Sequence, residues 1–244
     1  MGFPMLGRTM RTREAPMPAR LAAALRQDGA DMEHMRRLLA FVLTPDASCI
    51  DIGAHRGAVL QEMVRVAPAG HHIAFEPIPH LASLLSETFP QVEVRQVALS
   101  NQSGLSTFEH VHGVAEGCSG FQSCTTPPGY PDEVERITVR LETLDRALTP
   151  AHTPRLIKLD VEGAELQVLQ GALHTLSRCR PIVVFEHAYA ASNVYGTEPA
   201  DVYGLLCEAA GLRIFDLDGF GPYGSEQFEQ SSYTGERVNY VARV

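Results

Sequence analysis

A short glycine-containing segment near residue 50 has the residue types of a nucleotide-binding loop. Asp51-Ile52-Gly53-Ala54-His55-Arg56-Gly57 directly follows the apolar pair Cys49-Ile50 and opens a helical pattern. Gly53 permits a sharp turn and a close approach to a ligand, whereas Gly57 lets the next helix pack near the sheet. The spacing differs from the dinucleotide pattern G-x-G-x-x-G, and the carboxylate of Asp51 would repel a pyrophosphate. The loop therefore favours a cofactor with a cationic amino group and no phosphate.

A second carboxylate lies about 20 residues beyond this loop, at a spacing that is typical of ribose-binding acids. Phe75-Glu76-Pro77 ends the next apolar run, where Glu76 can accept hydrogen bonds from two ribose hydroxyls. Val97-Ala98-Leu99-Ser100 ends a third apolar run, whose backbone groups can contact an adenine. The residues that we expect to bind the cofactor are Asp51, Gly53, Ala54, His55, Gly57, Glu76, Pro77 and Ala98.

A third group of acidic residues lies at another predicted strand end. Ile157-Lys158-Leu159-Asp160-Val161-Glu162-Gly163-Ala164-Glu165 leads from an apolar run into a helical pattern and carries three carboxylates. Glu162 and Glu165 are explained equally well by the helix dipole, which stabilises acidic side chains in a first helical turn. Asp160 closes the strand at the edge of the cleft, so we expect it to take part in the reaction.

These loops require a sheet whose strands end on one side. Apolar runs alternate with helical patterns from Ser48 onward, which is typical of a mostly parallel sheet covered by helices on both faces. The strands are predicted at residues 49–52, 72–75, 92–99, 137–141, 156–159, 182–185, 212–217 and 237–244, of which the last suits an antiparallel strand. The helices are predicted at residues 58–66, 80–88, 164–176 and 200–210. The predicted fold class is a Rossmann-like, doubly wound α/β fold with a helical cap at its N-terminus.

The chain divides into a cap and a catalytic domain. Residues 1–44 form the predicted helical cap, whose apolar side can pack on its own sheet or on a second copy of the chain in a homo-oligomer. Residues 45–244 form the predicted domain, with an irregular insertion at about 108–135 that is rich in glycine and proline. His110 and His112 lie in this insertion, where they are either solvated or reach over the site. Residues 218–236 are predicted to be a loop.

Composition and charge exclude several classes of protein. The chain has 244 residues, of which 45% are hydrophobic and 20% charged, as in an ordinary compact domain. A net charge of -9 offers no basic surface for nucleic acid, and no apolar run is long enough to span a bilayer. We therefore expect a cytoplasmic protein that binds neither nucleic acid nor membrane. Five cysteines without a C-x-x-C pair argue against a disulfide scaffold or a structural zinc.

Four segments together resemble a known family. DIGAHRG, FEP, VALS and IKLDVEGAE occur in the order and spacing of the FkbM-like S-adenosylmethionine-dependent methyltransferases, and they cover residues 48–186. The resemblance implies methyl transfer, usually to an oxygen, with Asp51, Gly53 and Glu76 in the cofactor pocket and Asp160 near the reacting centre. Because the family often acts on saccharides, the expected acceptor is a hydroxyl of a saccharide or another small molecule.

A neutral alcohol needs help with the loss of its proton. Asp160 and the pair Glu186-His187 follow neighbouring predicted strands, so their side chains are expected in one crevice. In layout they resemble the catechol-type O-methyltransferases, which makes Asp160, Glu186 and His187 candidate catalytic residues and candidate ligands of magnesium or manganese. Alternatively, His187 is itself the general base and Glu186 orients it, or His187 only packs at the strand end.

One departure from the family and two other functions stay open. His55 stands where the family more often has Asn, so its contact with the cofactor can depend on pH. A nicotinamide-dependent oxidoreductase would need a phosphate-binding loop, against which the carboxylate of Asp51 argues. A catalytically silent scaffold would keep the cofactor pocket and bind a partner through the insertion, but it has no need of Asp160.

Overall fold

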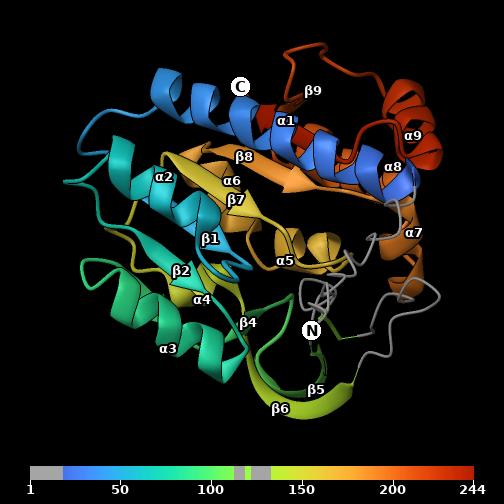
Figure 1. Cartoon of the computed structure of the whole chain (residues 1–244). Helices are drawn as coiled ribbons and strands as arrows, with labels where there is room; N and C mark the ends of the chain where they lie inside the picture. Colours follow the sequence, from blue (N-terminus) through green and yellow to red (C-terminus); the bar gives the residue numbers. More distant parts are fainter. Residues whose placement is uncertain (1–18, 113–118, 122–132) are drawn as a thin grey trace, which may run out of the picture.

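A seven-stranded sheet forms the centre of the protein. The structure is a computed structural model that describes residues 19–112, 119–121 and 133–244. The strand order is β3-β2-β1-β7-β8-β10-β9 (Figure 1). The strands are β1 (Cys49–Ile52), β2 (Ile73–Phe75), β3 (Glu93–Arg95), β7 (Leu156–Leu159), β8 (Ile182–Glu186), β9 (Arg213–Asp216) and β10 (Asn239–Arg243). The neighbours from β3 to β8 pair in parallel, whereas β10 is antiparallel to both β8 and β9. The predicted doubly wound fold and its antiparallel last strand are confirmed.

Both faces of the sheet are buried, because successive strand residues point to opposite sides. On one face Val183 and Phe185 of β8 join a core with Val168, Leu176 and Phe228. On the other face Ile182 and Val184 join a core with residues of the helices α1 and α2. Burial on both sides explains why these strands are continuous apolar runs rather than alternating ones.

The observed helices differ from the predicted ones mainly where tertiary contacts interrupt a helix. They are α1 (Ala19–Val42), α2 (Ala58–Val66), α3 (Pro79–Thr88), α4 (Leu144–Ala147), α5 (Glu165–Gln170), α6 (Leu173–Cys179), α7 (Tyr189–Ser192), α8 (Pro199–Tyr203) and α9 (Ser225–Thr234). The predicted helix at 164–176 is broken at Gly171, where a Cβ would lie 2.1 Å from the carbonyl oxygen of Ser100. The side chain of Asp145 then accepts hydrogen bonds from the backbone of His174 and Thr175 near the start of α6.

Two helical regions were not predicted in their observed form. α9 lies within residues 218–236, which we expected to be a loop. The sequence did not indicate this helix, because only Phe228 and Ser232 are buried in it and its apolar periodicity is weak. The predicted helix at 200–210 becomes α8 followed by a π-helical segment, Gly204–Ala209. In the N-terminal cap, α1 is one continuous helix whose residues Met35 and Leu39 pack into the core. The boundary near residue 44 and an association of copies through α1 stay predictions.

A smaller sheet stands beside the central one. It consists of β4 (Ala98–Leu99), β5 (Gly104–Val111) and β6 (Val134–Glu142) in the order β4-β6-β5 (Figure 1). The single strand predicted at 92–99 was wrong, because a turn closed by the Val97 N–H to the Arg95 carbonyl (2.9 Å) divides it between the two sheets. The irregular insertion predicted at 108–135 was also wrong at both ends, since residues 108–111 and 134–135 belong to a hairpin.

Two of the five cysteines lie in the remaining part of that insertion. Cys118 and Cys124, with most of the glycines and prolines of the insertion, lie outside the described residues. The described cysteines Cys49, Cys179 and Cys207 are free thiols. Within the described ranges, no helix is both long and apolar enough to cross a membrane.

Candidate active site

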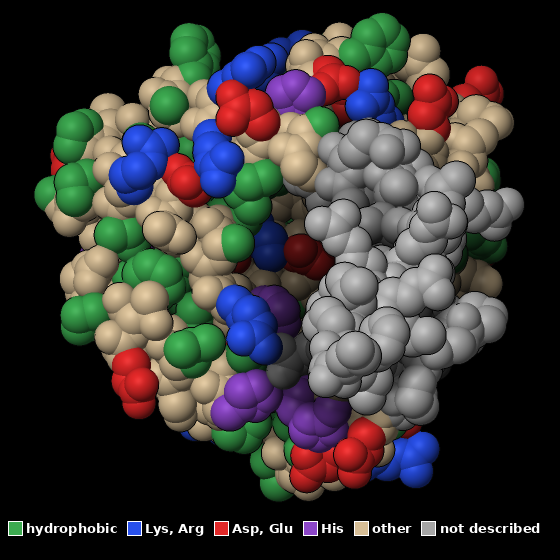
Figure 2. All heavy atoms as spheres, viewed as in Figure 1, with side chains coloured by type: hydrophobic (Ala, Val, Ile, Leu, Met, Phe, Trp, Pro, Cys, Tyr) green, Lys and Arg blue, Asp and Glu red, His purple; other side chains and the backbone are tan. Residues whose placement is uncertain are grey.

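The register of the parallel strands brings the predicted loops to one edge. Ile52 lies opposite both Phe75 and Leu159, and Leu159 lies opposite Phe185. The residues that follow these four positions therefore meet at the carboxyl edge of the sheet. A cavity of about 290 Å³ opens there. Figure 2 shows this hollow, with acidic and basic side chains at its floor. Its polar lining includes Asp51, His55, Glu76, Lys158, Asp160 and Glu162.

The glycine-containing loop crosses under the cavity in left-handed backbone conformations. Gly53 has a φ of 73°, and a Cβ on it would lie 1.8 Å from the carbonyl oxygen of Asp160, so only glycine fits. Gly57 has a φ of 80° and packs against Leu85 and Phe89 of the α3 region, where a Cβ would lie 2.6 Å from the Phe89 ring. Gly53 therefore lines the cavity, whereas Gly57 acts in helix packing and is not among the lining residues.

Glu76 forms hydrogen bonds with the loops that follow β1 and β2. Its Oε2 accepts a hydrogen bond from the backbone N–H of His55 (2.8 Å), and its Oε1 accepts one from Ile78 (2.9 Å). The side chain is almost fully buried, and this burial raises the pKa of Glu76 to about 7. A carboxylate oxygen can accept more than one hydrogen bond, so Glu76 can still receive hydroxyl groups from a ligand in the cavity.

Lys158 is a functional residue that the sequence analysis did not assign. Its Nζ lies 3.1 Å from Asp160 Oδ2 and 3.8 Å from Asp51 Oδ1, and it donates a hydrogen bond to the Gly53 carbonyl (3.1 Å). Burial lowers the pKa of Lys158, but the two carboxylates outweigh this effect and raise it above its usual value. The available signal was a lysine inside the otherwise apolar strand β7, since a buried cation needs acidic partners.

Three carboxylates gather beside the cavity, and two of them, Asp160 and Glu162, line it. Oxygen atoms of Asp160, Glu162 and Glu186 lie within 4.8 Å of one another. Burial and the charge of Asp160 raise the pKa of Glu186 well above its usual range, and the same two causes raise that of Glu162 to about 8. Burial also tends to raise the pKa of Asp160, but the ammonium of Lys158 and a hydrogen bond with Glu186 lower it. The group therefore combines one carboxyl that ionises more readily, Asp160, with two that hold their protons more tightly, Glu162 and Glu186.

Glu165 has a structural position. Its Oε1 accepts hydrogen bonds from the backbone N–H groups of Val161 and Gly163, both at 3.1 Å. These bonds hold the turn between β7 and α5, as expected for an acidic residue in a first helical turn. Of the two acids that the sequence left undecided, Glu162 thus faces the cavity and Glu165 supports the loop.

The structure does not bring His187 to the carboxylates. Its side chain is fully buried, and its ring stacks on Phe228 at a centroid distance of 5.6 Å and an interplanar angle of 20°. Burial lowers the pKa of His187 to about 4, so the ring is neutral at physiological pH. Successive residues of an extended strand face opposite sides, so Glu186 joins the carboxylates while His187 packs on Phe228. In the candidate group, Glu162 replaces His187.

The described lining suits S-adenosylmethionine. Asp51 is buried, and among the described residues no close hydrogen bond satisfies its carboxylate oxygens, whose nearest cation is Lys158. A buried carboxylate in this state suits a ligand that carries positive charge. Glu76 suits the ribose hydroxyls. The apolar wall suits an adenine and is formed by Ile78, Val97, Ala98, Leu99 and Phe108.

Comparisons with known proteins agree with this lining. Residues 51–213 match the Methyltransferase FkbM domain. The 2-O-methyltransferase NoeI of Sinorhizobium fredii is 25% identical over 174 residues, which cover 65% of this chain and 71% of that protein. The AMB antimetabolite synthetase AmbE of Pseudomonas aeruginosa is 28% identical over 183 residues, which cover 60% of this chain but 9% of that protein.

A solved structure shows the same fold. The crystal structure of a methyltransferase FkbM from Methylobacillus flagellatus KT aligns with a TM-score of 0.51 at 15% identity, and the match covers 82% of this chain and 44% of that chain. This chain therefore spans less than half of that protein. The family match includes the loop at Asp51, the carboxylate of Glu76 and the acids Asp160 and Glu186. The chain belongs to the FkbM family of S-adenosylmethionine-dependent methyltransferases.

Proposed function

We propose that the protein transfers a methyl group from S-adenosylmethionine to a hydroxyl oxygen of a small molecule or a saccharide. The observation that carries this proposal is the carboxylate of Asp160, which lines the cavity, lies 3.1 Å from Lys158 Nζ and has oxygen atoms of Glu162 and Glu186 within 4.8 Å. A relative that is 25% identical is named a 2-O-methyltransferase, which supports oxygen as the methylated atom. The acidic and apolar lining supports a neutral acceptor rather than an anionic one.

The cofactor, when bound, supplies an electrophilic methyl group on its sulfonium sulfur. Glu76 accepts hydrogen bonds from the ribose hydroxyls, and the buried carboxylate of Asp51 stabilises the positive charge of the amino-acid part. Asp160 accepts the proton of the acceptor hydroxyl as the O–CH₃ bond forms. Lys158, 3.1 Å from Asp160, keeps this carboxylate ionised before the transfer.

A divalent cation fits the same group of side chains. Asp160, Glu162 and Glu186 offer oxygen ligands only, and such ligands suit Mg²⁺ or Mn²⁺. A cation there would lower the pKa of the acceptor hydroxyl and orient it.

Two measurements test the proposal in sequence. Thermal unfolding is followed with S-adenosylhomocysteine or with NAD, and we expect only the former to raise the melting temperature, because a ligand that binds the native state stabilises it. Methyl transfer from isotopically labelled S-adenosylmethionine is then measured with a panel of saccharides and small alcohols, and NMR locates the methyl group in the product. A methyl group on nitrogen or carbon would overturn the O-methyltransferase proposal even if the cofactor binds.

The metal is tested separately. We expect chelation to lower turnover without loss of S-adenosylhomocysteine binding, and added Mg²⁺ or Mn²⁺ to restore it. Full turnover in excess chelator would exclude the cation and leave Asp160 as the unaided base.

A further inference from the structure

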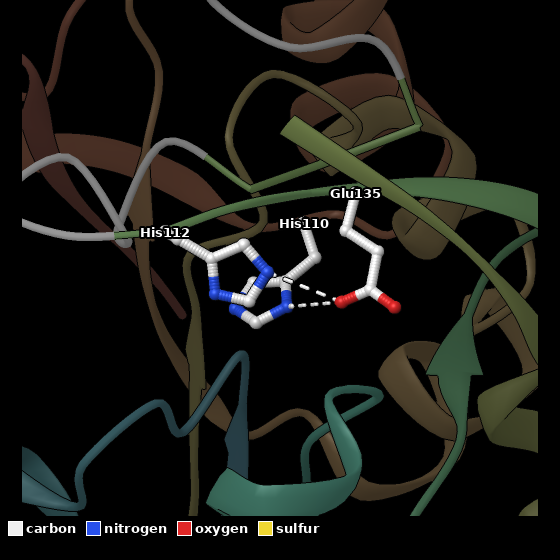
Figure 3. A group of neighbouring side chains, drawn as sticks. All are labelled: His110, His112 and Glu135. Carbon is white, nitrogen blue, oxygen red and sulfur yellow. Dashed lines mark hydrogen bonds and ion pairs between the residues drawn. The ribbon is translucent and has the colours of Figure 1, made fainter. Parts of the chain in front are cut away.

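A second group of possible ligands lies outside the candidate active site, on the hairpin of β5 and β6. His110 and Glu135 are directly opposite each other in the antiparallel pairing, and His112 lies just beyond the end of β5, where its N–H still bonds to the Glu133 carbonyl (2.9 Å). Residues two apart on a strand share a face, so all three side chains project from one side of the hairpin. Figure 3 shows the two imidazole rings and the carboxylate turned toward one another.

The contacts in this group converge on a single oxygen. Glu135 Oε2 lies 3.1 Å from His112 Nε2 and 3.9 Å from His110 Nδ1. The two rings are 4.0 Å apart between centroids, and one ligand atom from each of the three residues lies within 4.8 Å of the other two. The distance from His110 is too long for a hydrogen bond. A cation between the three atoms could be bound by both nitrogens and the carboxylate together.

Burial distinguishes this group from an ordinary surface ion pair. The side chain of His110 is only 4% exposed, whereas those of His112 and Glu135 are 42% and 57% exposed. One ligand is thus held in place by packing while the other two can adjust their rotamers. Zinc ligands lie about 2.0–2.2 Å from the metal, so closure around an ion requires movements on the order of 1 Å, within reach of exposed side chains.

The neighbourhood favours a metal of borderline softness. A third imidazole, His80 of α3, lies 5.3 Å from His110 between ring centroids. Figure 2 shows histidine side chains gathered at the rim of the hollow. Two imidazoles with one carboxylate form a donor set that suits Zn²⁺ and related transition metals better than Mg²⁺ or Ca²⁺. The oxygen-only group at Asp160 has the opposite preference.

We propose that His110, His112 and Glu135 bind a divalent transition metal, with Zn²⁺ as the best match, at a site separate from the candidate active site. Three protein ligands leave a fourth position for water. One of the ligands, His110, lies on β5 together with Phe108, which lines the cofactor cavity, so a bound ion rigidifies the hairpin that forms part of the wall of that cavity.

The test uses the full chain without a polyhistidine tag. The protein is dialysed against Zn²⁺ and then against metal-free buffer, and the retained zinc is measured by atomic emission. Affinity is measured by competition with a chromophoric chelator, and Co²⁺ is used as a spectroscopic substitute. We expect one tightly held zinc per chain and visible Co²⁺ absorption bands typical of a four-coordinate site with nitrogen ligands.

Matched variants decide where the metal binds. His112→Gln should weaken zinc binding by roughly 100-fold or more, and Glu135→Gln by roughly 10-fold, because each removes one ligand. His71→Gln is the control, since His71 is an exposed histidine with a glutamate, Glu93, at 3.2 Å, close to the 3.1 Å of the His112 pair. Asp160→Asn should leave zinc binding unchanged. Equal zinc binding by His112→Gln and the unchanged protein, or loss of zinc in Asp160→Asn, would overturn the proposal.

Discussion

At the scale of single residues, the structure gives different surroundings to two adjacent residues, Glu186 and His187, that the sequence predicted to share one site. Glu186 contributes to the carboxylate group, whereas His187 lies in the apolar core against Phe228. Among the described residues neither ring nitrogen of His187 has a hydrogen-bond partner, which is consistent with a ring that serves packing. Catalytic importance is therefore expected at Asp160 and not at His187.

Asp160→Asn should lower kcat by roughly 100- to 10,000-fold, because it removes the group that accepts the hydroxyl proton. Binding of S-adenosylhomocysteine should change little, since the cofactor contacts assigned to Asp51 and Glu76 remain. His187→Phe preserves an aromatic ring beside Phe228 and should keep kcat within about 3-fold, with a loss of stability of roughly 1–3 kcal/mol from overpacking. Steady-state kinetics and isothermal titration calorimetry measure both variants. A catalytic defect in His187→Phe as large as that of Asp160→Asn would restore His187 as the base.

Glu76 is the residue on which cofactor affinity should depend most. Glu76→Gln at pH 8 should weaken binding of S-adenosylhomocysteine by roughly 1–3 kcal/mol, because a charged hydrogen-bond acceptor is lost. The pKa of Glu76 is about 7 without ligand, so the affinity of the unchanged protein should rise with pH through 7 as the carboxylate ionises. Calorimetry from pH 6 to 8 measures this, with the exposed Glu87→Gln as control. Unchanged affinity in Glu76→Gln would contradict the ribose assignment.

At the scale of elements, the loop that follows β1 packs directly against the loop that follows β7. The left-handed turn at Gly53 brings its Cα against the carbonyl oxygen of Asp160, and Lys158 of β7 donates a hydrogen bond back to the Gly53 carbonyl. A change in either loop must therefore displace the other. The cofactor loop and the reacting carboxylate are positioned by the same contact.

Gly53→Ala tests this coupling. A left-handed alanine costs about 1–2 kcal/mol by itself, and the contact of 1.8 Å adds a steric term, so the expected loss of stability is roughly 3 kcal/mol or more. Gly235→Ala is the matched control, because Gly235 has a similar φ of 63° but nothing within 4 Å of an added Cβ. Urea unfolding measures both. Equal losses in the two variants would show that the packing of Gly53 against Asp160 contributes no additional stability.

At the scale of the whole molecule, the carboxyl edge of the sheet concentrates buried acids around one lysine. Burial raises the pKa of Asp51, Glu76, Glu162, Glu165 and Glu186. Their ionisation in the folded state is costly without a positively charged ligand. The acids that prepare the site for a sulfonium cofactor thus make the free protein sensitive to pH.

The stability of the free protein should fall as the pH rises from about 4.5 to about 8 and level off above that. A carboxyl group whose folded-state pKa is raised binds more protons in the folded than in the unfolded protein above about pH 4.5, so its contribution is lost as pH rises through the folded-state value. Each group adds a slope of at most about 1.4 kcal/mol per pH unit. Urea midpoints across this range measure the effect, and Glu76→Gln should reduce the slope. A flat profile for the unchanged protein would contradict the raised pKa values.

The sequence alone determined the fold class and the loops that border the cavity. Continuous apolar runs predict strands buried on both faces, and Asp51, Gly53 and Glu76 follow such runs at spacings that only a parallel sheet brings to one edge. These features are local, because a strand and the loop after it are encoded within about 10 residues. The family resemblance rests on the same segments and was confirmed over residues 51–213.

Tertiary structure decided which side chains share a site. The sequence could not show that Glu186 joins Asp160 and Glu162 while His187 packs on Phe228. Nor could it pair Lys158 with Asp51 and Asp160, or divide residues 92–99 between two sheets. It also could not bring Glu135 opposite His110, since the register of a hairpin depends on pairing between strands more than 20 residues apart. Contacts of this kind depend on how elements pack against one another, and local residue patterns do not encode them.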